Sequence, residues 1–239
     1  MRPSRAASKR APDAPPKRTR GGHRPTGTSA NRRSKAATGA TPKGERARAE
    51  LVRAARVVFE RVGYIDARVT DIVHEAGMAH GSFYTYFPSK LEVFQEVLRQ
   101  MGQSMREAVA HAPEDVPGDT LMNLERANHR YLVHYRGHAK LMALMEQVAT
   151  IDSQIAAFRL DARRRHVERV AKTILRLQER GLADPDVDPS TTAGALVAML
   201  SSYAYWSTVK PMDVDVDTTA RVVTAIWSRA IGLRDAKAS

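Results

Sequence analysis

The sequence contains no cysteine, so disulfide bonds and thiolate metal sites are excluded and nothing points to an oxidising compartment. Its longest apolar run, AGALVAML at 193–200, is far shorter than the roughly 20 residues that a membrane-spanning helix needs. The basic N-terminus has no apolar segment behind it, which is not typical of a secretory signal. We therefore expect a cytoplasmic protein without a membrane segment.

Acidic residues are nearly absent from the first part of the chain. Residues 1–44 hold twelve Lys or Arg against one acid, whereas residues 45–239 hold 26 basic and 25 acidic residues, so almost all of the +12 net charge resides in the leading segment. This segment is rich in Pro, Ser, Thr, Gly and Ala and has no apolar periodicity, which predicts a disordered tail. The tail is either an electrostatic arm for nucleic acid or a solvated extension, even a mis-assigned start.

Strand-like alternation is also missing from the rest of the chain, where helical periodicity predicts an all-α fold. An apolar stripe from Leu51 to Val62 predicts a first helix that stops at Gly63. Two short helices are expected at 69–76 and about 81–87, and Ser89 and Glu92 have the spacing of a capping box at the start of a fourth helix. Two short helices behind a longer one are the outline of a helix-turn-helix domain, which we place at 45–90.

Aromatic residues make up only 6% of the chain, yet four of them fall within five consecutive positions, namely Phe83, Tyr84, Tyr86 and Phe87. The i, i+4 spacing puts Phe83 and Phe87 on one helix face, where we expect them to be core. Gly81, Ser82 and Thr85 lie on the opposite face and are small enough for the helix to enter a major groove, with the two tyrosines on its flanks. The alternative is that all four rings belong to the core.

These elements, in this order, resemble the tetracycline-repressor-like (TetR) transcriptional regulators over about residues 46–105. AARVVFERVGY is similar to the first helix of that family, DIVHEAG to the second, and GSFYTYFPSKLEVF to the recognition helix and the start of the fourth. The resemblance implies that a recognition surface faces DNA and that Lys90 reaches a phosphate; the surface residues are His80, Gly81, Ser82, Tyr84, Thr85 and Tyr86. One departure is that Ala67 and Arg68 stand where the family has a capping Ser or Thr, and we expect Arg68 to supply a phosphate contact instead.

Residues 91–235 are predicted to form a helical ligand-binding and dimerisation domain. Helices are expected at about 119–136, 138–149, 152–180, 190–208 and 217–232. Asn128, Tyr131 and Tyr135 follow an i, i+3, i+7 spacing, and the next helix carries Met142, Met145 and Glu146. Polar groups and adaptable methionines around a bundle interior suit a small-molecule pocket, although a core with satisfied polar groups is the alternative.

Two other groups in this domain do not indicate a site. His134 and His138 are four residues apart, but Gly137 interrupts the helix between them and no carboxylate completes a metal site, so we expect neither metal nor cofactor. The run RLDARRRHVERV at 159–170 is predicted to be the solvated side of an amphipathic helix whose Val167, Val170 and Ile174 face inward.

The last two helices carry more apolar surface than one-sided packing needs. The candidates for a homodimer interface are Leu196, Leu200, Tyr203, Val222, Val223, Ile226 and Trp227. The resemblance implies that this helix pair forms a four-helix bundle with its twin, and a two-fold axis would double a short recognition site into a palindrome. Burial inside the protomer is the alternative.

Two functions remain open and a third is disfavoured. The resemblance implies a dimeric repressor that a small-molecule effector of unknown identity releases from a double-stranded DNA operator. The alternative is a sequence-tolerant DNA-coating protein whose affinity comes from the basic tail. An enzyme is disfavoured, because the sequence has no phosphate-cradling glycine loop, nucleophile elbow or paired carboxylates, and we assign no catalytic residues.

Overall fold

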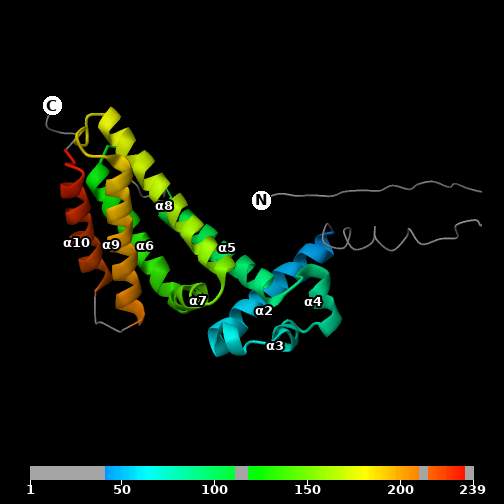
Figure 1. Ribbon diagram of the computed structural model, residues 1–239. Coiled ribbons are helices and arrows are strands. Elements are labelled where there is room, and N and C mark those ends of the chain that lie inside the picture. Colours follow the sequence, from blue (N-terminus) through cyan, green and yellow to red (C-terminus); the bar gives the residue numbers. More distant parts are fainter. Residues whose placement is uncertain (1–40, 111–117, 210–214, 235–239) are drawn as a thin grey trace, which may run out of the picture.

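The computed structural model describes residues 41–110, 118–209 and 215–234, and every regular element within these ranges is an α-helix, which confirms the all-α prediction (Figure 1). The helices are α2 (Pro42–Asp66), α3 (Val69–Glu75), α4 (His80–Tyr86), α5 (Lys90–Val109), α6 (Thr120–Gly137), α7 (Ala139–Ala149), α8 (Ser153–Glu179), α9 (Pro189–Val209) and α10 (Val216–Ala230). The predicted tail at 1–44 lies outside the described residues except for its last four positions, of which 42–44 are already helical.

Glycines and capping side chains set the helix ends of the N-terminal domain. Thr41 begins α2 by accepting a hydrogen bond from the Gly44 amide at 3.1 Å. Gly63 leaves helical geometry at a φ of 82°, so the predicted stop is correct. A short helical segment follows this kink and extends α2 to Asp66. Gly77 turns the chain between α3 and α4 at a φ of 62°, a conformation that glycine adopts without steric cost. Together, α2, α3 and α4 form the predicted helix-turn-helix unit.

A first core closes this unit with aromatic rings. Phe59 and Phe94 meet edge to face at 5.0 Å between ring centroids, and Phe83 and Phe87 pair at 5.9 Å. All four are at most 3% exposed, as are Leu51 and Ile72 and several smaller side chains around them. Helix α7 adds two further buried side chains to the same cluster, so the helix-turn-helix unit packs directly against the C-terminal helices.

A second core joins α6, α8, α9 and α10. The buried Asn128 amide on α6 donates to Thr224 Oγ1 on α10 at 2.9 Å, so this polar pair is satisfied across the core. Four of the predicted interface residues belong to this core and are 2–6% exposed, namely Leu196, Leu200, Val223 and Trp227. Burial inside the protomer, the alternative reading, therefore holds for these four, whereas Tyr203, Val222 and Ile226 are 37–53% exposed.

Helix α5 links the two cores. Ser89 begins it by accepting from the Glu92 amide at 3.2 Å, as the capping-box spacing predicts. Its first half buries Val93 and Phe94 in the first core, and Met105 contacts the second. Figure 1 shows α5 running from the helix-turn-helix unit alongside α8 into the C-terminal bundle. The described helices include no candidate for a transmembrane segment.

Candidate functional site

Helix α4 turns opposite faces to the core and to solvent. Phe83 and Phe87 are 0% and 3% exposed, whereas Tyr84 is 50% exposed and Tyr86 is half-buried against the first core. The predicted division of the aromatic cluster is therefore confirmed for the two phenylalanines, and the reading in which all four rings are core is contradicted by Tyr84. The residues predicted to face DNA are exposed at His80, Gly81, Tyr84 and Thr85 and half-buried at Ser82 and Tyr86.

Gly81 leaves space that the protein does not use. A Cβ atom built at this position would have nothing within 4 Å, so no packing within the described residues requires a glycine here. In a helix interior glycine costs about 1 kcal/mol relative to alanine. The exposed notch at Gly81 is thus suited to the close approach of a partner surface such as a major-groove edge.

Helix α3 begins without the side-chain cap that Ser or Thr would supply. The Asp71 carboxylate instead reaches back to accept from the Arg68 backbone N–H at 2.9 Å, and the Arg68 carbonyl accepts from the Asp71 amide at 3.1 Å. The Arg68 side chain is exposed and stays available for a phosphate. Asp71 is the residue that the sequence reading missed, although its position three residues after the cap is a recognised signal.

Lys90 has a different environment from the one we expected. Its ammonium group donates to three carbonyl oxygens at the end of α2, those of Tyr64 at 2.8 Å, Ile65 at 3.1 Å and Ala67 at 2.8 Å. It also lies 4.7 Å from the centroid of the Tyr64 ring. Burial lowers the pKa of this half-buried lysine. An ammonium group has three N–H donors, and all three are engaged, so the expected phosphate contact has to be replaced by a structural role.

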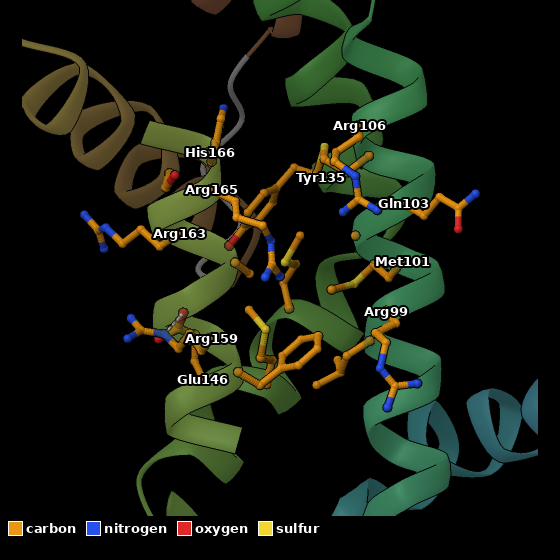
Figure 2. A pocket seen from close by; sticks show the side chains of 18 of the residues that line it. Arg99, Met101, Gln103, Arg106, Tyr135, Glu146, Arg159, Arg163, Arg165 and His166 are labelled. Atoms are coloured by element: carbon orange, nitrogen blue, oxygen red, sulfur yellow. Dashed lines mark hydrogen bonds and ion pairs between the residues drawn. The ribbon is translucent and has the colours of Figure 1, made fainter. Parts of the chain in front are cut away.

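A cavity of about 790 Å³ opens between α5 and α8 and extends to α6, α7 and α9 (Figure 2). Five of the six residues predicted to bind a ligand line it, namely Tyr131, Tyr135, Met142, Met145 and Glu146. The sixth, Asn128, is a correction: its amide is bonded to Thr224, and it does not reach the cavity. The volume is within the range of cavities that hold drug-sized ligands.

The sequence reading missed the arginines of the cavity. Six of them line it, Arg99 and Arg106 from α5 and Arg159, Arg163, Arg165 and Arg169 from α8. The four on α8 belong to the run predicted to be a solvated face. That prediction is confirmed for Arg163, Arg164, Arg165 and Arg169, which are exposed, but it did not foresee that part of this face borders a cavity. The inward packing of Val167, Val170 and Ile174 is confirmed. A sequence signal existed, because Arg159 and Arg163 are four residues apart, as are Arg165 and Arg169, and this spacing puts each pair on one helix face.

Burial keeps the polar groups of the cavity neutral. The Tyr131 hydroxyl lies 3.2 Å from Ser201 Oγ, and burial raises the pKa of Tyr131 and of Tyr135. Burial, helped by the charge of Arg169, lowers the pKa of His166 to about 4, and its ring stacks on that of Tyr131. At neutral pH these side chains are uncharged hydrogen-bonding groups. In the described ranges, His, Asp and Glu side chains nowhere gather in the threes that a metal site would need.

The N-terminal domain matches a known family model. Residues 51–97 match the model described as bacterial regulatory proteins, tetR family. The chain is 39% identical over 64 residues to the uncharacterized HTH-type transcriptional regulator YdgC of Bacillus subtilis, and the match covers 27% of this chain and 33% of that protein. It is 20% identical over 194 residues to the HTH-type transcriptional regulator EthR of Mycolicibacterium smegmatis, covering 80% and 89% of the two chains.

Solved structures share the whole fold. SmeT in its complex with triclosan superposes with a TM-score of 0.68 at 17% identity, covering 80% of this chain and 93% of that one. A protein from Saccharomonospora viridis in complex with choline gives a TM-score of 0.66 at 22% identity, covering 78% and 98%. The relatives are transcriptional regulators and not enzymes, in agreement with the sequence reading. The match of residues 51–97 and the sequence relatives support a TetR-family regulator, and the solved structures, all under 25% identical, show the fold that the chain shares with such regulators.

Proposed function

We propose that this protein is a transcription factor in which α4 reads an operator in double-stranded DNA and the cavity binds a small-molecule effector that weakens the reading. The observation that carries this proposal is the course of α5. Its first half buries Val93 and Phe94 beneath the helix-turn-helix unit, and its second half lines the cavity with Met101 and Arg106. A ligand that changes the distance between α5 and α8 also moves Val93 and Phe94, the α5 side chains on which the helix-turn-helix unit rests. Release follows if the ligand prefers the shifted state.

An ion-pair link supports the same coupling. Glu96 on α5 accepts from Arg48 of α2 at 2.9 Å and also pairs with Arg99, and both Glu96 and Arg99 line the cavity. The neighbouring arginines, Arg48 first, lower the pKa of the Glu96 carboxyl group. A cavity residue is thereby bonded directly to the first helix of the DNA-binding unit.

A homodimer is part of the proposal. Exposed apolar side chains on the last two helices, Tyr203, Trp206, Val222 and Ile226, are candidates for the subunit interface. Helix α9 contains no charged residue, a composition typical of a helix that is largely covered by other helices. We expect Ile226→Glu to yield a monomer in analytical ultracentrifugation. Leu160→Glu is the control, since Leu160 is 66% exposed and lies on α8, which is not one of the last two helices.

Repression and effector release are proposed from the relatives. SmeT is described as the repressor of a multidrug efflux pump of Stenotrophomonas maltophilia and has been solved with triclosan, and the Saccharomonospora viridis protein has been solved with choline. These complexes support a small-molecule ligand for this chain as well. We propose the same mode of action for this chain, in the cytoplasm.

The first experiment substitutes Gly81, the exposed glycine of α4. Gly81→Ala adds a methyl group into open space, so we expect stability to be unchanged or to rise by up to about 1 kcal/mol. Affinity for DNA from upstream of the protein's own gene should fall, as measured by fluorescence anisotropy. Gly137→Ala is the matched control, because a Cβ there also has nothing within 4 Å and the residue ends α6. Equal DNA affinity of the two variants would count against α4 as the reading helix.

The second experiment separates operator reading from tail-driven coating. The full chain and a chain that begins at Thr41, which keeps the cap of α2, are compared on native and scrambled duplexes over a range of salt concentrations. We expect both chains to prefer the native duplex, with a shallower salt dependence for the shorter one. Loss of all binding in the shorter chain, with no sequence preference in the longer one, would favour the coating protein.

A further inference from the structure

Positive charge in the cavity exceeds the negative charge that could balance it. Six arginines and two glutamates line the cavity. Both glutamates already have arginine partners: Glu96 pairs with Arg48 and Arg99, and Glu146 accepts from Arg159 at 2.6 Å. The remaining cavity arginines, namely Arg106, Arg163, Arg165 and Arg169, have no carboxylate of the cavity wall left to pair with.

Three of these remaining cations converge from opposite walls. Figure 2 shows the side chains of Arg106 on α5 and Arg165 on α8 directed into the gap between the two helices, whereas Arg163 is directed away from it. Arg169 lies one helical turn beyond Arg165 on the same face. Burial and the charges of Arg106 and Arg165 lower the pKa of Arg169, which places the three guanidinium groups within electrostatic range of each other. Of the three, Arg165 pairs with Asp161.

Like charges held together in a partly desolvated site repel one another, and an anion between them would remove that cost. Guanidinium groups bind carboxylates and phosphates with two parallel hydrogen bonds, so the cluster suits an oxyanion. The cavity wall also includes apolar and adaptable side chains, namely Met101, Met142, Met145 and Phe158. A cavity of about 790 Å³ is much too large for an inorganic anion alone.

We propose that the effector is an amphipathic organic anion whose carboxylate or phosphate group lies between Arg106, Arg165 and Arg169 and whose apolar body lies against the methionines and Phe158. This inference rests on the proposed function, since it names the chemical class of the ligand of the same cavity. It also predicts that cationic molecules of the same shape are excluded.

The test compares ligands that share a body and differ in charge. Decanoate, decyl phosphate, 1-decanol and decyltrimethylammonium are titrated into the full-length protein at one ionic strength by calorimetry, below the concentrations at which they form micelles. We expect decanoate or decyl phosphate to bind at least about tenfold more tightly than the alcohol, and the cation not at all. Whichever of the two anions binds more tightly identifies the preferred head group, carboxylate or phosphate. Acetate and inorganic phosphate, which lack the body, should bind too weakly to measure.

Two neighbouring arginines provide a matched pair of variants. Arg164 and Arg165 both pair with Asp161, but only Arg165 lines the cavity. Arg165→Gln should weaken binding of the anion by about tenfold or more, while Arg164→Gln should leave it within about twofold. Arg106→Gln tests the opposite wall in the same way, and thermal unfolding of each variant verifies that it is folded.

The outcomes separate this inference from the proposed function. Equal affinity for decanoate and decyltrimethylammonium, or equal losses in the two neighbouring variants, overturns the inference. If the anions bind by this charge rule but leave DNA affinity unchanged, the ligand class stands and ligand-responsive regulation fails. If a neutral or cationic compound releases DNA while the anions do not bind, regulation stands and the ligand class fails.

Discussion

The two cores of the molecule differ in how closely they are packed and in the polarity of the groups beside them. The first, under the helix-turn-helix unit, is closely packed around phenylalanine rings, with Phe59, Phe83 and Phe94 fully buried. Beside the second core is a cavity lined by polar groups, including Tyr131, whose hydroxyl lies within hydrogen-bonding distance of Ser201, and His166, whose ring stacks on that of Tyr131. An apolar core with few voids fixes a surface in one geometry. A cavity with polar walls and methionines instead leaves room for a ligand and for more than one packing.

The arginines of the two regions also differ, in whether an acidic side chain balances their charge. In the N-terminal domain Arg53, Arg56 and Arg61 each have a glutamate partner at 2.6–3.1 Å. In the described ranges neither Arg106 nor Arg169 is in an ion pair at such a distance, although the charge of the neighbouring Glu168 acts on Arg169. The positive charges of these arginines are thus balanced in the N-terminal domain and are not fully balanced in the cavity, where an anionic ligand could balance them.

Removal of a ring from the first core should have the largest effect. Phe83→Ala deletes a fully buried side chain, and we expect it to lower the free energy of unfolding by about 3–5 kcal/mol. Urea unfolding followed by circular dichroism measures this loss. Tyr84→Ala, one residue along α4 and 50% exposed, is the control and should cost much less. Similar losses in the two variants would mean that α4 packs in another orientation.

Acid should destabilise the second core through His166. Its pKa is about 4 in the folded protein and near 6.5 in the unfolded chain, so the unfolded chain binds more protons between these values. The stabilising contribution is complete above pH 6.5 and is lost as the pH falls toward 4, up to about 3 kcal/mol. His166→Gln should reduce this pH dependence. A pH profile of unfolding that is the same in both proteins would contradict burial of the neutral ring.

Lys90 tests the junction between the two regions. Lys90→Met removes the donor for three carbonyl oxygens, and we expect a loss of about 1–3 kcal/mol in the free energy of unfolding. Lys140→Met, on an exposed lysine of α7, is the control. If the Lys90 variant kept its stability but no longer bound DNA, the result would favour the phosphate contact that was expected from the sequence.

The polar pair of the second core should give the smallest effect. Thr224→Val leaves the buried Asn128 amide without its acceptor, which should cost about 1–2 kcal/mol in thermal or urea unfolding. The double variant with Asn128→Leu removes both polar partners and should lose less than the sum of the two single variants. Additive losses would show that the hydrogen bond contributes nothing of its own.

Local features of the fold could be predicted from the sequence. Capping residues and glycines gave the helix ends, since Ser89 and Gly63 act within one turn of their own positions. The i, i+4 spacing of Phe83 and Phe87 gave the buried face of α4 for the same reason. The positions of Tyr131 and Tyr135 on the cavity side of α6 also followed from helical spacing.

The errors arose where a partner is distant in sequence. The acceptor of Asn128 is Thr224, which is 96 residues away, and the acceptors of Lys90 are backbone carbonyls that have no signature of their own. Periodicity shows that Leu196 and Leu200 are apolar but not which helix covers them. The charged stripe on α8 is exposed as expected, but the sequence does not show that α5 lies across a cavity from part of it.

Helix α5 also limits how this architecture can be recombined. Because Val93, Phe94, Val97 and Leu98 complete the first core, a segment cut at residue 90 would expose the undersides of α2 and α4. A chimaera that kept this DNA specificity and acquired another sensor domain would need its crossover beyond Leu98, inside the helix. It would also have to replace the contacts that Leu141 and Val148 of α7 make with that core. The regions proposed to read DNA and to bind a ligand are therefore not interchangeable modules joined by a linker, and under the proposed function a new ligand specificity is more accessible by substitution on the cavity side of α5 and α8.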